Sequence, residues 1–387
     1  MKKAMKIAAL GAATFALAAG TVGCSADRGG TTAPESGGTA TEESSEGDAS
    51  CAYASDALIG VAMPTKSLER WNRDGAHLKE LLEADGFKVD LQYADNKVDQ
   101  QISQIENMIN NGAEILVVAS IDGEALDPVL TTAADKGIPV IAYDRLIRET
   151  EAVDYYATFD NEKVGTLQGE YIVEALDLEN ATGPIYLEPF AGSPDDNNAK
   201  YFFKGAWDIV SPYIESGVIE VPSGKAPATV DDWQSIGILG WDGAAAQDEM
   251  EVRLNSNYRD KKVDVVLSPN DSLALGIAQA LEADGYVPGD EYPVLTGQDA
   301  DQANVVNILA GKQSMTVWKD TRALGDRVAI MVKEIATCGD VEVTDTETYD
   351  NGRKVVPSYL LDPVVVTKDN VEELLIGSGF YTEDDLK

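Results

Sequence analysis

Charged and aromatic residues gather where buried strands are predicted to end. In Gly137–Arg145, the apolar run Ile138–Tyr143 is followed at once by Asp144 and Arg145. Asp, Asn and Arg make paired hydrogen bonds that suit vicinal hydroxyls, and Trp offers a flat apolar face to a sugar ring. The set therefore favours a site for a neutral sugar. Its members are Arg70-Trp71, Asp144-Arg145, Asp195-Asp196-Asn197-Asn198, Trp241-Asp242, Asn270-Asp271, Gln298-Asp299 and Lys319-Asp320.

These residues also have a structural interpretation. An Asp or Asn that follows a strand commonly caps the next helix, and for any single Asp this alternative stays open. Trp207 lies inside a predicted helix, where core packing is expected. Trp233 lies in a predicted loop and is left unassigned.

Motifs for catalysis and metal binding are missing from the sequence. Paired carboxylates could hydrolyse glycosides, but no spacing singles out two of them in so acidic a chain. The sequence has no GxSxG, no Cys–His nucleophile pair and no GxGxxG that opens a helix. Its one histidine, His77, is expected on the surface of a helix, and no metal-ligand cluster is present. We therefore predict no enzyme, no catalytic residue, no metal and no cofactor.

Predicted strands and helices alternate along the chain, which indicates an α/β fold with doubly wound parallel sheets. The first half has predicted strands at 57–63, 87–93, 115–120, 138–143 and 155–159, and helices at 67–85, 98–111 and 123–136. The second half has predicted helices at 162–175, 199–213, 271–283, 302–310 and 322–336, and strands at 183–187, 263–267, 293–296 and 314–318.

The two halves resemble each other at their strand ends. The segment 117–122 parallels 265–271, and 141–144 parallels 295–299. Ligands of open α/β sheets bind outside the carboxyl ends of the strands. Two such domains that face each other would bring both sets of polar residues into one cleft, which could close by hinging.

The chain is strongly acidic. It has 387 residues, enough for two or three domains, with 67 acidic against 30 basic residues and a formal charge of -37. Such a surface repels nucleic acid and anionic lipid headgroups. A DNA-binding repressor is disfavoured because it would need a helix-turn-helix and a basic face.

Residues 1–24 have the pattern of a bacterial lipoprotein signal peptide. Three lysines precede an apolar core at 7–19, and the sequence Thr-Val-Gly-Cys ends in Cys24, the predicted lipidation site. An ordinary cleaved signal is the alternative. Residues 25–50 have almost no apolar side chains and are predicted to form a disordered tether. A tethered lipoprotein suits a Gram-positive cell surface better than a free periplasm.

Two further cysteines remain, Cys51 and Cys338. An even pair in an exported protein favours a disulfide, and Cys51 stands where the chain enters the fold. Two buried free thiols are the alternative.

Several motifs occur in the order found in one known family. They are Met63-Pro64 with Arg70-Trp71, Ser103–Met108, Ala142–Arg145, Phe159-Asp160-Asn161, Gly192–Ala199, Gly297–Ala300 and Pro357–Leu361. From about Ile59 to the C-terminus the chain closely resembles the xylose-binding and multiple-monosaccharide-binding proteins of bacterial ABC importers. The segment Ile236–Gln247 fits the multiple-sugar branch better.

The resemblance implies a type I periplasmic-binding-protein fold, two Rossmann-like lobes joined by a three-strand hinge. On this map the N-terminal lobe comprises residues 51–159 and 320–356, and the C-terminal lobe comprises 160–319 and 357–387. Cys51 and Cys338 then fall in the same lobe.

The resemblance also implies a site. Trp71 and Trp241 would sandwich a sugar ring, and polar residues would hold its hydroxyls and ring oxygen. For Asp144 and Gln298 the alternative is to orient Arg145 or to cap a helix. The polar residues are Arg70, Asp144, Arg145, Asp196, Asn198, Asn270, Gln298, Asp299 and Lys319.

The function implied is capture of xylose, glucose, galactose or arabinose by hinge closure and delivery to an ABC permease and its ATPase. The protein is expected to be a monomer that is anchored to the outside of the cell membrane through Cys24. The alternatives are a sugar sensor that presents its ligand to a membrane receptor kinase and, less favoured, a sugar-acting enzyme.

Overall fold

The computed structural model describes residue 53 and residues 56–289 and 291–387, and the fold is given for these. The predicted leader at 1–24, the predicted tether at 25–50 and Cys51 lie outside them. None of the helices in the described ranges is long and apolar enough to cross a membrane.

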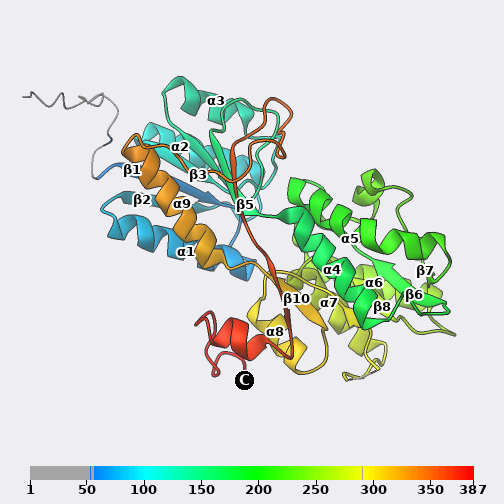
Figure 1. Ribbon diagram of the computed structural model, residues 1–387. Coiled ribbons are helices and arrows are strands. Elements are labelled where there is room, and N and C mark those ends of the chain that lie inside the picture. The colour runs from blue at the N-terminus through cyan, green and yellow to red at the C-terminus, as the bar shows by residue number, and fades with distance from the viewer. Residues whose placement is uncertain (1–52, 54–55, 290) are drawn as a thin grey trace, which may run out of the picture. The chain divides into compact units, whose positions relative to one another are not determined.

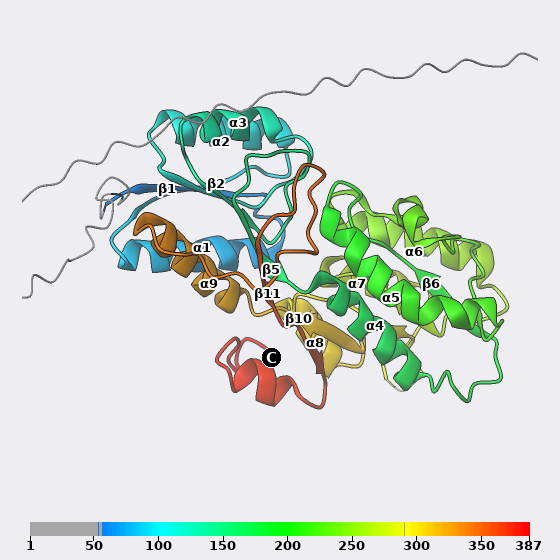
Figure 2. The same ribbon diagram turned by 45° about the horizontal axis from the view of Figure 1, so that its top comes forward.

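The first lobe contains a six-stranded parallel sheet with the strand order β11-β5-β4-β3-β1-β2. Helices α2 and α3 cover one face of this sheet, and α1 and α9 cover the other (Figures 1 and 2). The strands are β1 (Leu58–Met63), β2 (Lys88–Tyr93), β3 (Ile115–Val118), β4 (Val140–Tyr143), β5 (Tyr155–Phe159) and β11 (Ser358–Leu361). The helices are α1 (Glu69–Ala84), α2 (Val98–Asn110), α3 (Asp127–Asp135) and α9 (Thr321–Ala336).

Strand β4 shows why this sequence forms a sheet that is covered on both faces. All four of its residues are buried. Ile141 and Tyr143 pack in the cluster that includes α1 and α9, and Val140 and Ala142 pack in the cluster that includes α2 and α3. Side chains alternate along a strand, so a continuous apolar run fills both cores.

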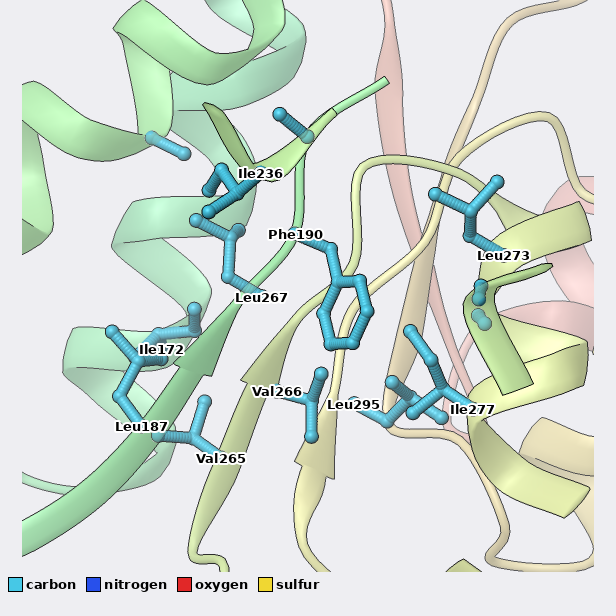
Figure 3. Close-up of a cluster of buried hydrophobic side chains, with 14 of the residues drawn as sticks. Ile172, Leu187, Phe190, Ile236, Val265, Val266, Leu267, Leu273, Ile277 and Leu295 are labelled. Carbon is cyan, nitrogen blue, oxygen red and sulfur yellow. The ribbon is translucent and has the colours of Figure 1, made fainter. Parts of the chain in front are cut away.

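The second lobe has a four-stranded parallel sheet with the order β7-β6-β8-β9. Figure 3 shows its apolar core, in which Phe190, Val266 and Ile277 lie together. Helices α4 and α5 run side by side, as do α6 and α7 (Figures 1 and 2). The strands are β6 (Ile185–Pro189), β7 (Ile219–Glu220), β8 (Val265–Leu267) and β9 (Val294–Leu295). The helices are α4 (Asn161–Ala175), α5 (Asn197–Glu215), the 3₁₀ turns η1 (Val230–Ile236) and η2 (Leu239–Trp241), α6 (Gly243–Asn257), α7 (Asp271–Ala283) and α8 (Gln302–Leu309).

Glycines allow α4 and α5 to approach closely. A Cβ on Gly165 would lie 1.9 Å from the carbonyl oxygen of Phe202, and one on Gly205 would lie 2.0 Å from that of Glu162. Real side chains cannot come this close, so the pair of helices requires glycine at both contact points.

The chain passes between the lobes three times, after β5, after β10 (Met315–Trp318) and between β11 and β12 (Val364–Thr367). Strands β10 and β12 form an antiparallel pair. The predicted lobe boundary at 356/357 comes slightly early, because β11 pairs with β5 in the first sheet and extends it to Leu361. The predicted α/β fold with parallel sheets is confirmed.

Cys338 follows the end of α9 and forms a disulfide. Its predicted partner, Cys51, lies outside the described residues, so this pairing stays a prediction. Tyr53 lies close to this end of α9, since its backbone N–H donates to the Ala336 carbonyl at 3.0 Å. This contact supports the predicted pairing.

Candidate functional site

A pocket between the lobes brings all eleven predicted sugar-binding residues together. Leu68 and Phe202 also line it, and the sequence analysis did not include them. The eleven are Arg70, Trp71, Asp144, Arg145, Asp196, Asn198, Trp241, Asn270, Gln298, Asp299 and Lys319. Their shared location is as predicted, and their role as sugar ligands stays a prediction.

Each of the eleven predicted residues lies close to the end of a strand or the start of a helix. Asp144 and Arg145 follow β4, and Lys319 follows β10. Gln298 and Asp299 lie in the loop after β9, and Asn270 precedes α7. The pocket therefore lies at the carboxyl ends of the strands, where open α/β sheets bind their ligands.

Arg70 is the centre of a buried charge network. Its Nη2 lies 2.8 Å from Asp74 Oδ2 and 2.8 Å from Asp144 Oδ1, and its Nη1 lies 3.5 Å from Asp299 Oδ1 across the cleft. Burial raises the pKa of Asp144, but Arg70, Lys319 and Arg145 lower it by more, so its pKa lies below the usual range. Asp144 thus pairs with Arg70, an arrangement that the sequence did not predict.

A second network joins the lobes through Asp196. Its Oδ2 lies 2.9 Å from Arg145 Nε and accepts a hydrogen bond from Trp241 Nε1 at 3.1 Å. Its Oδ1 accepts from the backbone N–H of Asn198 at 3.0 Å and so caps α5. Burial raises the pKa of Asp196 by more than Arg145 lowers it. Asp196 therefore caps α5 and lines the pocket at the same time.

Asn198 makes direct contacts with the opposite lobe. Its Nδ2 donates to the Asp144 carbonyl at 2.6 Å, and its Oδ1 accepts from the Tyr156 hydroxyl at 3.0 Å. The Tyr156 hydroxyl also lies 2.8 Å from the Asp144 carbonyl oxygen. Asp144 has φ of +62°, a left-handed conformation that aims its carbonyl at these donors. Tyr156 is not among the predicted site residues, because it lies within an ordinary apolar strand.

Two indole rings contribute aromatic surface to the pocket. Trp71 is 1% exposed and Trp241 is 5% exposed. The guanidinium of Arg145 lies 5.1 Å from the Trp71 ring centre, and Phe202 packs edge-on against Trp241 at 6.3 Å. Trp71 Nε1 and Gln298 Oε1 are buried and have no hydrogen-bond partner within the described residues. A ligand in the pocket could provide one.

Other predicted residues have structural roles. Asp242 caps α6 and Asp320 caps α9 through their side chains. Asn270 caps α7 with its Oδ1 while it lines the pocket. Trp207 is buried and stacks on Phe203, so the expected core packing is confirmed. Trp233, left unassigned, is also buried in the second lobe.

Two carboxylates lie close to the Asp299 loop, namely the buried one of Asp271 and the partly buried one of Asp301. Asp271 Oδ2 accepts from the backbone N–H of Asp301 at 2.9 Å and lies 3.0 Å from the Thr316 hydroxyl. Burial, reinforced by Asp299 and Glu69, raises the pKa of Asp301 to about 7. Burial also raises the pKa of Asp271.

The raised pKa of Asp301 predicts that the free energy of unfolding falls as the pH rises from about 4 to about 7. In that window the folded protein keeps a proton that the unfolded chain, with an Asp pKa of about 3.9, releases. Asp301→Asn fixes the neutral state. We expect it to be more stable than the unmodified protein at pH 8, by roughly 1–3 kcal/mol, and to gain little at pH 4.

Urea unfolding at pH 4, 6 and 8 measures this effect. Asp248→Asn, which changes an exposed carboxylate on α6, is the matched control and should leave the pH profile unchanged. An Asp301→Asn profile that runs parallel to that of the unmodified protein would contradict the prediction.

Comparison with known proteins agrees with this architecture. A family model described as a periplasmic binding protein domain matches residues 59–340. The multiple sugar-binding periplasmic protein SbpA of Azospirillum brasilense is 48% identical over 330 residues, which cover 85% of this chain and 91% of SbpA. The D-xylose-binding periplasmic protein of Escherichia coli K12 is 38% identical over 335 residues, which cover 87% of this chain and 94% of that protein.

Solved structures show the same similarity. An ABC transporter solute-binding protein from Clostridium phytofermentans with bound β-D-glucose is 53% identical, with a TM-score of 0.81, and the match covers 85% of this chain and 100% of that one. A carbohydrate transporter solute-binding protein from Chloroflexus aurantiacus in complex with D-glucose is 36% identical, with a TM-score of 0.76. The match covers 84% of this chain and 97% of that one. With its two parallel-sheet lobes and the pocket between them, the chain belongs to the periplasmic binding protein domain family.

Proposed function

We propose that this protein captures a monosaccharide between its lobes and delivers it to an ABC importer. The observation that carries the proposal is the pocket, in which Trp71 and Trp241 lie among hydrogen-bonding groups from both lobes. Aromatic faces suit the C–H surface of a sugar, and carboxylate, amide and guanidinium groups suit its hydroxyls.

The charges that line the pocket favour a neutral ligand. Three lining residues are positive, namely Arg70, Arg145 and Lys319, and three are negative, namely Asp144, Asp196 and Asp299. These side chains pair with one another, as in the contact of 3.0 Å between Lys319 and Asp299. A charged ligand would break this balance in a buried site, whereas a polyhydroxylated ring offers donors and acceptors without net charge.

Two similar proteins were solved with bound D-glucose, which supports glucose as the first candidate to test. Xylose, galactose and arabinose follow as members of the same class.

The mechanism is capture by closure. Contacts such as Arg145–Asp196 and Asn198–Asp144 join the lobes beside the pocket. A ligand that contacts both lobes favours the closed form by the difference between its affinities for the closed and open forms. Opening would then release the sugar chemically unchanged, and the eleven residues would act as binding groups rather than catalysts.

The proposal extends to where the protein acts. Periplasmic binding proteins are extracytoplasmic, and we propose that this one is anchored to the membrane through a lipidated Cys24 and reaches its permease as a monomer. A disulfide between Cys51 and Cys338 would fix the start of the folded region to α9. A Gram-positive surface fits the tether at 25–50.

One relative supports a second candidate function. The multiple sugar-binding periplasmic receptor ChvE of Rhizobium radiobacter is 48% identical over 338 residues. The word receptor in that name favours a sensor that presents the sugar-loaded form to a membrane protein. Pull-down of a permease or of a receptor kinase by the sugar-loaded protein distinguishes the two functions.

A thermal-shift panel tests the binding itself. A ligand that binds the folded form raises the melting temperature by mass action. We expect D-glucose or another monosaccharide of the same class to raise it and sugar acids to have less effect. NMR of the recovered sugar after long incubation should show it unaltered. Conversion of the sugar would instead support an enzyme.

The position of Trp241 provides a further prediction. A Cβ on Gly192 would lie 2.0 Å from Cη2 of Trp241. Gly192→Ala therefore has to displace the indole, and we expect sugar affinity to fall on the order of tenfold to a hundredfold. Calorimetry measures the change. Gly339→Ala, whose Cβ would lie 3.5 Å from the Glu334 carbonyl, is the control; equal affinities for the two variants would contradict the prediction.

A further inference from the structure

The C-terminal segment packs on the second lobe beneath α8 (Figures 1 and 2). Strand β12 pairs with β10, and a π-helical turn, Glu372–Ile376, follows. Leu375 and Tyr381 are buried with Ala300 and Trp318 in one apolar cluster. The segment is therefore held firmly against the loop after β9 that carries Asp299.

Tyr381 extends from this cluster to the other lobe. Its hydroxyl lies 2.9 Å from the Ala300 carbonyl and 3.2 Å from Glu69 Oε1, and it accepts a hydrogen bond from Arg73 Nη1. Burial raises the pKa of Tyr381, so the hydroxyl keeps its proton at neutral pH and can donate it. One hydroxyl thus contacts the Asp299 loop of the second lobe and helix α1 of the first.

The loop on one side of this hydroxyl is strained. Asp299 has φ of +98° and Ala300 has φ of +51°, values at which a residue other than glycine is under backbone strain. Hydrogen bonds hold it from within the lobe, since the Asp299 N–H donates to the Val317 carbonyl at 2.9 Å and the Asp301 N–H donates to Asp271 at 2.9 Å. The hydroxyl of Tyr381, which belongs to the C-terminal segment, donates a further hydrogen bond to the Ala300 carbonyl.

Helix α1 lies on the other side of this hydroxyl. Glu69 and Arg73, which Tyr381 contacts, form an ion pair of 2.8 Å on the first turn of α1. Between them in the sequence lie Arg70 and Trp71, which line the pocket. Arg73 also lies 4.7 Å from the ring centre of Phe380 and 3.6 Å from Asp301.

We propose that Tyr381 is a positioning residue for the sugar site, an inference that rests on the proposed function. Its hydroxyl joins the Asp299 loop to the turn that presents Arg70 and Trp71, so it stabilises the relative placement of the two halves of the pocket. Tyr381 itself does not line the pocket. It acts through Ala300, Glu69 and Arg73, and it slows opening of the closed form.

Tyr381→Phe tests this role with little change in packing. The phenylalanine ring keeps its place in the apolar cluster and loses only the hydroxyl. We expect the dissociation constant for D-glucose to rise about tenfold, because the contacts of the hydroxyl with the Ala300 carbonyl, Glu69 and Arg73 are lost. In stopped-flow tryptophan fluorescence the change should appear in the dissociation rate, with the association rate nearly unchanged.

Tyr292→Phe is the matched control. It removes a hydroxyl that lies 3.2 Å from the Ala278 carbonyl in the same lobe, away from the pocket. It should leave both rates unchanged even if it lowers the melting temperature. Equal dissociation rates for Tyr381→Phe and the unmodified protein would overturn the proposal, as would a change confined to the association rate.

A second measurement separates this proposal from the proposed function. Small-angle X-ray scattering of the sugar-free protein reports how far the lobes are apart. Tyr381→Phe should increase the radius of gyration and Tyr292→Phe should not. If the unmodified protein bound none of the sugars, the proposed function would fail, and this comparison would still decide whether Tyr381 holds the lobes together. An unchanged radius would then overturn that role.

Discussion

Replacing Arg70 by methionine is expected to destabilise the protein by about 3–5 kcal/mol near neutral pH. The guanidinium is buried and pairs with Asp74 and Asp144, and with Asp299 across the cleft. Methionine preserves much of the volume but leaves the buried carboxylates of Asp74 and Asp144 without their main cation. The free energy of unfolding, measured by urea titration at pH 7.5, checks the prediction.

The pH dependence of this variant is also predicted. Arg70 lowers the pKa of both Asp74 and Asp144, so without it the pKa values of these two carboxyls rise, and protonation relieves part of the loss as the pH falls toward 5. Arg148→Met is the control, because the side chains of Arg148 and its partner Glu124 are 36% and 59% exposed, far more than that of Arg70. That pair should contribute no more than about 1 kcal/mol. Similar losses in the two variants would show that the Arg70 network does not stabilise the fold.

Trp241→Ala is expected to weaken monosaccharide binding by on the order of a hundredfold, about 3 kcal/mol. The substitution removes an aromatic wall of the pocket and also the N–H that donates to Asp196 at 3.1 Å. Trp241→Phe keeps an aromatic face and should lie between the alanine variant and the unmodified protein. Calorimetry with D-glucose measures all three.

Trp207 provides the control for this substitution. It is buried in the same lobe but stacks on Phe203 and does not line the pocket. Trp207→Phe should lower the melting temperature and leave the dissociation constant unchanged. Undiminished binding by Trp241→Ala would show that its indole is not part of the site.

Most of the fold could be predicted, because buried parallel strands and amphipathic helices leave clear patterns. The apolar run that became β4 is an example, since all its residues are buried. Helix α6 was missed because its sequence is mostly polar and its few buried residues, such as Met250 and Leu254, give only a weak stripe. Strand β7 has only two residues, too few to show a period.

The position of β11 shows a different limit. The sequence of β11 does not indicate which of the two sheets it joins, because this depends on the strand with which it pairs in the folded protein. The structure pairs it with β5 in the first sheet. A segment that crosses between lobes is defined by contacts that are distant in sequence.

Site residues could be predicted where polar side chains stand at the ends of predicted strands. Asp144, Arg145 and Asn270 stand directly after strands or before helices, and their types suggested a polar ligand. Tyr156 and Phe202 gave no such indication, because aromatic residues within a strand and a helix resemble core. Tyr381 lies 312 residues from its contact Glu69, so only the folded chain brings them together.

The measurement that bears most directly on the proposed function is calorimetric titration of the purified protein with D-glucose, followed by NMR of the recovered sugar. We expect saturable binding of one sugar per chain, recovery of the sugar unchanged, and much weaker binding in Trp241→Ala. Absence of binding to glucose, xylose, galactose and arabinose alike, or recovery of a converted product, would contradict capture of a monosaccharide between the lobes.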